Sequence, residues 1–263
     1  MVDAEQARAS HADRYYLLDG MRGIAAILVA LMHFSSSFGG RHNLIAPHAY
    51  SAVDFFFALS GLVIARAYER RLRSGMTFRT FLEVRVVRLY PLFLVGLLLG
   101  LGKEIVGLAM HRPEALPPVE VAFAVPFNSV MLPDFSGRIA TLNGPSWTLT
   151  LELLVNIAFA LILYRLSVRS LRVGILLSGV VLLAAILSYG TGDIGWRVAT
   201  FPGGLARISF GFMVGMMVGR TAPDNARPSA LSLLLLLPLL ALLLRPPTGV
   251  RLAYDLTLDL LLF

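Results

Sequence analysis

Two ionisable residues, Arg22 and His33, lie within the first long apolar run of the sequence. Eleven residues apart on an α-helix, they would differ by about 20° after three full turns and lie roughly 16 Å apart along the axis, so they share one face. A guanidinium can hold a phosphate or carboxylate, and a histidine can accept a proton at neutral pH. The alternative is that Arg22 only reaches a membrane surface and His33 only caps the helix end.

Arg85 and Arg88 stand at the start of another apolar run. Residues three apart share a helix face, so the two guanidinium groups could grip phosphates together. The alternative is ordinary anchoring of a helix end by basic residues.

A carboxylate, Glu152, lies inside a later apolar run that follows the segment containing Asn143 and Trp147. A buried carboxylate needs a partner, which Arg22, Arg85, Arg88 or Arg207 could supply. A purely structural ion pair competes with a catalytic role.

Asp54 and Arg207 are also charged residues inside apolar runs. Asp54 could orient His33 if the first two helices form a hairpin, and Arg207 could pair with Glu152 or touch a ligand. Both residues are as easily explained by structure as by function, although an ionisable group inside a membrane helix is a functional candidate by default.

The elements that must position these residues are membrane helices. The chain has 263 residues, 57% of them hydrophobic and 15% charged, whereas a soluble domain averages roughly 45–50% apolar and about 25% charged residues. The apolar residues form repeated runs near the length of roughly 20 residues that crosses a bilayer. We therefore expect an all-α, polytopic bundle with seven full spans and a partial eighth, at 17–38, 51–68, 86–110, 147–166, 173–189, 205–218, 231–244 and 252–263.

Basic residues predict how the bundle is oriented. With a cytoplasmic N-terminus, the inside segments hold twice as many Arg and Lys residues as the outside segments, including the dense cluster from Arg66 to Arg88. This bias favours the N-terminus inside. Topology explains the net charge of +7 better than nucleic acid does, so the expected partner is the lipid bilayer.

Other chemistries lack their signatures. With no cysteine, disulfides and a cysteine nucleophile are excluded, and no metal site is expected. The sequence has no HExxH, Walker A, strand-linked GxGxxG or GxSxG motif. The chain is interpreted as one membrane domain over 1–263. Because it stops within a half-length apolar segment, that segment is either re-entrant or the chain is a fragment truncated at its C-terminus.

Five segments together resemble the membrane-bound acyltransferase 3 family, in the family's order. The first carries the family's spacing of arginine, ten residues and histidine at Arg22 and His33. The segments are LDGMRGIAAILVALMHF (18–34), VDFFFALSGLVI (53–64), FLEVRVVRLYP (81–91), NGPSWTLTLE (143–152) and FPGGLARISFGFMVGMMVG (201–219).

The resemblance implies a bundle of about ten membrane helices in a bacterial inner membrane. It implies acyl-CoA, usually acetyl-CoA, as donor, and a hydroxyl of a carbohydrate or small molecule as acceptor, as in O-acetylation of cell-envelope polysaccharides. By position, Arg22 and His33 match the family's functional pair, Arg85 and Arg88 its arginine pair, and Glu152 its carboxylate. The family continues for roughly three more helices, which this sequence lacks.

The resulting hypothesis is a histidine-dependent O-acyltransferase. His33, oriented by Asp54 or Glu152, would act as base, while Arg22, Arg85 and Arg88 bind the donor. Asn143, Trp147 and Arg207 are the expected acceptor contacts. Two alternatives are a transporter or flippase of a lipid-linked sugar that uses the same arginines as an anion path, and an inactive truncated acyltransferase.

Overall fold

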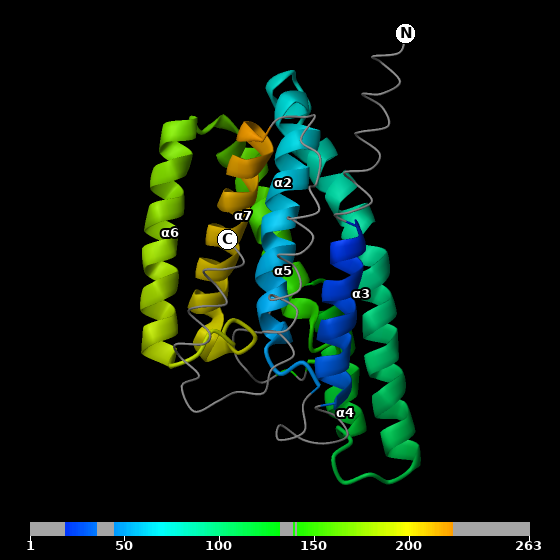
Figure 1. Ribbon diagram of the computed structural model, residues 1–263. Coiled ribbons are helices and arrows are strands. Elements are labelled where there is room, and N and C mark those ends of the chain that lie inside the picture. The colour runs from blue at the N-terminus through cyan, green and yellow to red at the C-terminus, as the bar shows by residue number, and fades with distance from the viewer. Residues whose placement is uncertain (1–18, 36–44, 132–138, 140, 223–263) are drawn as a thin grey trace.

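The computed structural model describes residues 19–35, 45–131, 139 and 141–222, and every regular element among them is helical (Figure 1). A first helix covers 19–35. The elements that follow are η2 (Ala49–Ser51), α2 (Ala52–Arg73), α3 (Phe78–Ala109), α4 (Pro118–Ser129), α5 (Ser146–Leu161), η3 (Leu163–Arg165), α6 (Val168–Tyr189), η4 (Val198–Thr200) and α7 (Phe201–Thr221).

Four helical stretches are long and apolar enough to cross a membrane: Ala49–Arg73, Phe78–Ala109, Val168–Tyr189 and Val198–Thr221. They correspond to the expected spans at 51–68, 86–110, 173–189 and 205–218. The expected span at 147–166 is shorter, because α5 has 16 residues and ends at Leu161. The expected spans at 231–244 and 252–263 lie outside the described residues, as does the end of the chain.

Two helices extend further than hydropathy predicts, because local polar contacts decide where they begin. The Thr77 hydroxyl accepts a hydrogen bond from the backbone N–H of Thr80 at 3.2 Å, so α3 starts eight residues before the expected span, at Phe78. Such a cap satisfies one of the N–H groups that a helix start leaves unbonded. Similarly, Ser167 accepts from Ser170 N at 3.0 Å and starts α6 at Val168.

The tightest packing joins α2 and α7, which lie side by side and run in the same direction (Figure 1). Glycines make this approach possible: a Cβ on Gly61 would collide with the backbone carbonyl of Phe212, and one on Gly215 with that of Ala58. Small residues let membrane helices approach closely enough for dispersion contacts to hold them together.

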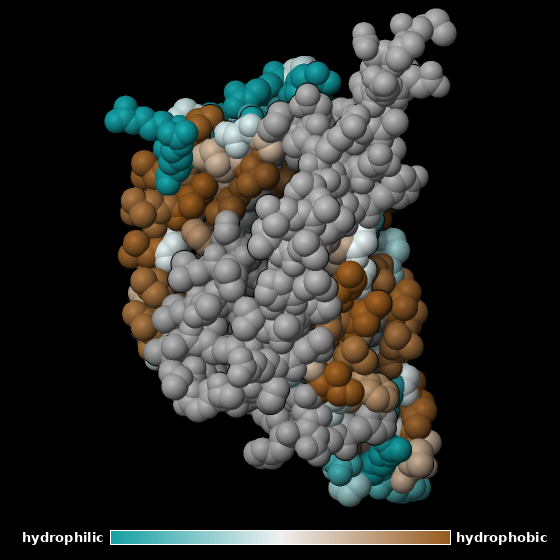
Figure 2. Space-filling view, viewed as in Figure 1, coloured by the Kyte–Doolittle hydropathy of each residue, from teal (hydrophilic) through white to brown (hydrophobic). Residues whose placement is uncertain are grey.

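The core lies where α2, α3, α5 and α7 meet. Phe159 of α5 contacts Phe81 at a ring separation of 5.8 Å and Phe212 at 6.0 Å, and all three side chains are fully buried. By contrast, α3 and α6 expose many apolar side chains, such as Leu99 (71% exposed) and Leu176 (67%). Figure 2 shows these apolar surfaces between hydrophilic ends, the distribution expected of a lipid-facing bundle.

Replacing Gly61 tests the close packing of α2 on α7. We expect Gly61→Ala to lower stability by about 1–3 kcal/mol, because the added methyl group must displace backbone. Thermal unfolding of the detergent-solubilised protein measures this. Gly102→Ala is the matched control, since a Cβ there meets nothing within 4 Å, and it should be neutral or slightly stabilising. Equal effects of the two variants would contradict the packing described here.

Candidate functional site

Among the ion pairs of the described residues, the most buried joins Asp54, near the start of α2, to Arg207 in α7. Arg207 donates from Nε to Asp54 Oδ1 at 2.9 Å and from Nη2 to Oδ2 at 2.6 Å, a bidentate arrangement. The Asp54 side chain is only 2% exposed and the Arg207 side chain only 3%. Such a pair tolerates burial because each charge is matched by hydrogen bonds.

Arg207 also holds two backbone segments in place. Its Nη1 donates to the carbonyl of Ile194 at 2.9 Å, and its Nη2 to the carbonyl of Tyr50 at 3.0 Å. Ile194 belongs to the connection between α6 and α7, and Tyr50 lies in η2. One guanidinium therefore joins α2, α7 and the loop between α6 and α7. The sequence suggested that Asp54 would orient His33 and that Arg207 would pair with Glu152. In the structure Asp54 and Arg207 instead pair with each other.

Trp147, in the first turn of α5, lies beside this pair. The Arg207 guanidinium carbon is 5.8 Å from the Trp147 ring centre, within the range of a cation–π contact. The ring also packs edge-on against Phe57 at 6.5 Å. Gly195 packs against the Trp147 ring so closely that a Cβ there would lie 2.7 Å from it. Its φ of +113° is also one that favours glycine.

A second buried polar cluster joins α2, α3 and α5 through Glu152. Its Oε1 accepts from Ser60 Oγ at 2.9 Å and from Arg85 Nη2 at 3.0 Å. Arg85 is buried, yet its Nε and Nη1 have no hydrogen-bond partner among the described residues. A buried guanidinium with unused donors can bind an anion or a carbonyl oxygen. Of the four arginines that the sequence suggested as partners of Glu152, Arg85 is the one that bonds to it in the structure.

Arg88 does not join that cluster. Its side chain is exposed, and no ion pair or hydrogen bond links it to a described residue. A spacing of three residues rotates a helix position by about 300°, so Arg88 lies about 60° from Arg85 around α3. That offset is enough to place Arg85 toward α5 and Arg88 on the surface.

Arg22 and His33 lie at opposite ends of the helix over 19–35. The Arg22 side chain pairs with Asp19 at 2.7 Å and is 37% exposed. His33 is exposed near the other end, and the carboxylate of Asp193 is close enough to interact with it electrostatically. Asp193 was not predicted from the sequence. The sequence could have suggested it in one way only: Asp193 lies between the expected spans at 173–189 and 205–218, and that connection is predicted on the same side of the membrane as the His33 end of the first span.

Contacts on both sides fix the backbone around Asp193. Its own N–H donates to Thr191 Oγ1 at 3.1 Å, and Gly195 N donates to Thr200 Oγ1 at 3.1 Å. The following carbonyl, that of Ile194, is the one held by Arg207. The Asp54–Arg207 pair therefore supports the loop that brings Asp193 near His33.

Asn143 lies away from these clusters, in the segment before α5. Its side-chain amide packs over Gly96 of α3, where any Cβ would collide with it, and its carbonyl accepts from Ser146 N at 3.0 Å. Within the described part of the chain, no group of three or more His, Cys, Asp or Glu side chains is arranged to hold a metal ion.

Breaking the buried pair tests its structural role. We expect Asp54→Asn to destabilise the protein by about 3–5 kcal/mol, because it leaves the Arg207 charge buried without its counter-ion. The control is Glu83→Gln, which breaks the exposed Arg79–Glu83 pair and should change stability by less than about 0.5 kcal/mol. Thermal unfolding in detergent compares them, and a shift for Asp54→Asn as small as the control's would refute the role.

Comparison with known proteins agrees with the sequence motifs. The family model described as an acyltransferase domain, that of the acyltransferase 3 family, matches residues 15–258. The chain is similar to "Protein 2 in picA locus" from Rhizobium radiobacter, with 36% identity over 198 residues, which cover 68% of this chain and 98% of that protein. No solved structure gives a significant match. With its apolar helices and this match over most of its length, the chain belongs to the acyltransferase 3 family of multi-pass membrane proteins.

Proposed function

We propose that this protein transfers an acyl group, in the simplest case acetyl, from acyl-CoA to a hydroxyl group of a carbohydrate or another small acceptor. The observation that carries the proposal is that the chain belongs to an acyltransferase family over most of its length, with His33 exposed near one end of the helix over 19–35. The charge of Asp193 acts on His33 as a secondary feature. A histidine can accept a proton from an attacking hydroxyl, and a carboxylate within electrostatic reach favours the imidazolium that results.

In the proposed reaction, His33 accepts the proton of the acceptor hydroxyl as its oxygen attacks the thioester carbonyl. The new C–O bond forms and the C–S bond breaks. The leaving thiolate of CoA then takes the proton that His33 holds, which returns the imidazole to its neutral form. Asp193 favours the imidazolium that forms transiently, so its role is electrostatic. Asp54 acts one step further away, because Arg207 links it to the loop that carries Asp193.

Arg85 is the proposed inner contact of the donor. Its two unbonded donors, Nε and Nη1, suit an amide carbonyl of the pantetheine arm or the oxygen of the thioester. Glu152 fixes the guanidinium through Nη2, which makes Glu152 a positioning residue in this scheme. Arg22 and Arg88 remain proposed contacts of the donor, as the resemblance to the family implies.

The acceptor is proposed to approach from the end of the bundle that carries His33 and Trp147. The half-buried indole of Trp147 offers an aromatic face of the kind that packs well on sugar rings. Arg207 is buried and engaged by Asp54 and two backbone carbonyls, so its proposed role is to position Trp147 and the loop between α6 and α7. Asn143 remains a proposed acceptor contact.

Orientation in the membrane follows from the charge distribution. Most of the arginines that the structure describes lie at the ends of α2 and α7, in η3 and at the starts of α3 and α6, and such ends face the cytoplasm. We propose that this end meets cytoplasmic acyl-CoA in a bacterial inner membrane, with the N-terminus on the same side.

Removing the imidazole tests the proposed base. We expect His33→Asn to lower the rate of CoA thiol release from acetyl-CoA about 10²- to 10⁴-fold. The matched control is His111→Asn, at an exposed position with φ of +51° that asparagine tolerates. Retention of full activity by a folded His33→Asn protein would remove His33 from the mechanism. Transport of substrate without thioester consumption in the wild type would favour a transporter.

Asp193→Asn tests the proposed electrostatic partner. We expect kcat to fall about tenfold or more, equivalent to about 1.4 kcal/mol of lost transition-state stabilisation, while KM for acetyl-CoA changes little. Steady-state kinetics of thiol release separate the two constants, and thermal unfolding confirms that the variant is folded. A change confined to KM would assign Asp193 to donor binding instead.

A further inference from the structure

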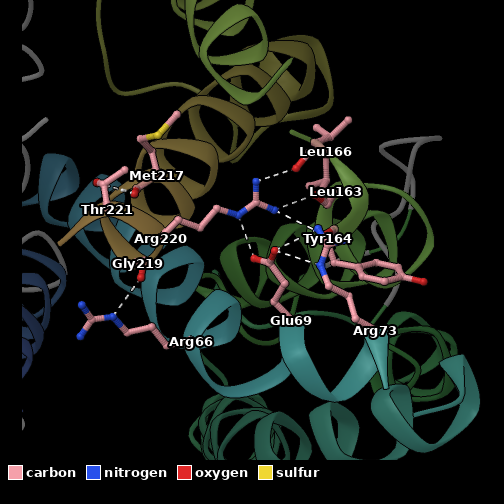
Figure 3. Close-up of polar contacts among 10 residues, drawn as sticks. All are labelled: Arg66, Glu69, Arg73, Leu163, Tyr164, Leu166, Met217, Gly219, Arg220 and Thr221. Carbon is pink, nitrogen blue, oxygen red and sulfur yellow. Dashed lines mark hydrogen bonds and ion pairs between the residues drawn. The ribbon is translucent and has the colours of Figure 1, made fainter. Parts of the chain in front are cut away.

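An open hollow of about 290 Å³ lies between the C-terminal ends of α2 and α7, at the arginine-rich end of the bundle. Its charged lining consists of Arg66, Glu69, Arg70, Arg73 and Arg220. Figure 3 shows Glu69, Arg73 and Arg220 pointing toward one another near Tyr164, while Arg66 lies apart from them beside Gly219. None of them was singled out by the sequence motifs or used in the proposed reaction.

Backbone carbonyls hold two of these guanidinium groups in fixed positions. Arg66 donates from Nε to Gly219 O at 3.2 Å and from Nη2 to Ala222 O at 2.9 Å, at the end of α7. Arg220 donates from Nη1 to Leu166 O at 2.7 Å, just after η3. Carbonyls at helix C-termini carry partial negative charge that would repel an anion. Here the guanidinium groups neutralise that charge, so the hollow can accept an anion.

Glu69 compensates only part of the positive charge. Its Oε2 accepts from Arg220 Nε at 2.8 Å, and its Oε1 accepts from Arg73 Nη2 at 3.1 Å (Figure 3). Arg73 also donates to the carbonyl of Tyr164. The lining thus holds four guanidinium groups against one carboxylate. The resulting excess of positive charge suits an anionic ligand such as a phosphate ester or diphosphate.

Arg70 differs from the other arginines of the lining. Its side chain is exposed, and no hydrogen bond or ion pair joins it to a described residue. Its neighbours are held in place by carbonyls and Glu69, whereas Arg70 has all five N–H donors available. A ligand that enters the hollow would therefore meet the fixed guanidinium groups of Arg66 and Arg220, and the Arg70 side chain could reorient to bind it.

From this arrangement we propose that the hollow is a binding site for phosphate esters. Arg70 is the residue that contacts the ligand, while Arg66 and Arg220 form the preorganised wall. The phosphates at the nucleotide end of acyl-CoA are one source of this chemistry, an assignment that rests on the proposed function. The headgroup phosphate of an anionic phospholipid is the other source, and the experiment separates the two.

The test compares wild type with Arg70→Ala in detergent, using isothermal titration calorimetry with adenosine 3′,5′-bisphosphate. We expect Arg70→Ala to weaken binding about fivefold to tenfold, and the wild-type affinity to fall as salt is raised. Arg71→Ala is the matched control: Arg71 is also exposed, next in sequence and outside the lining, where it contacts the ring of Tyr68 at 5.7 Å. It removes the same charge and should leave affinity nearly unchanged.

The lipid arm measures thermal unfolding in nanodiscs of phosphatidylcholine with and without phosphatidylglycerol. One outcome assigns the phosphate site to lipid: phosphatidylglycerol raises the unfolding temperature, Arg70→Ala abolishes this rise, Arg71→Ala retains it, and the nucleotide does not bind. If neither ligand distinguishes Arg70→Ala from Arg71→Ala, the proposal is overturned. Neither measurement involves turnover, so a failure of the proposed acyl transfer would appear separately, as absent thiol release.

Discussion

The bidentate pair between Asp54 and Arg207 is the interaction on which the rest of the described structure depends. Removing two charges from solvent costs several kcal/mol per ion unless the geometry is close to ideal, and here the guanidinium bonds both carboxylate oxygens and two backbone carbonyls. These bonds fix the register of α2 on α7 and hold the loop between α6 and α7. That loop also carries Asp193, whose charge acts on His33.

Polar groups in this bundle occupy separate levels along the helices. Asp54 lies six residues before Ser60 on α2, so roughly 9 Å separates the Arg207 pair from the Glu152 cluster along that helix. Nearer the end of α2, Arg66 and Arg220 tie helix C-termini together. Apolar side chains such as Phe81 and Phe159 fill the core between α3 and α5. This layering is compatible with a donor that enters at the arginine-rich end and an acceptor that enters at the other.

Local patterns predicted the helical fold well and the pairing of charges poorly. Hydropathy located α2, α3, α6 and α7 because a long apolar run is a property of neighbouring residues. The partner of Arg207 could not be predicted, since Asp54 lies 153 residues away and several carboxylates were available. A spacing of three residues suggested that Arg85 and Arg88 act together. Their positions differ by about 60° around α3, however, and this leaves Arg85 buried and Arg88 exposed. Asp193 lies in a loop without periodicity, so only the fold brings it to His33.

The most direct test of donor entry at the arginine-rich end is a sidedness measurement in membrane vesicles. Acetyl-CoA is added outside two preparations of opposite orientation, and CoA thiol release is followed in each. We expect release only from vesicles whose outer surface carries the arginine-rich end formed by Arg66, Arg70 and Arg220, because the donor is proposed to enter there. Equal release from both orientations, or release only from the opposite one, would contradict it.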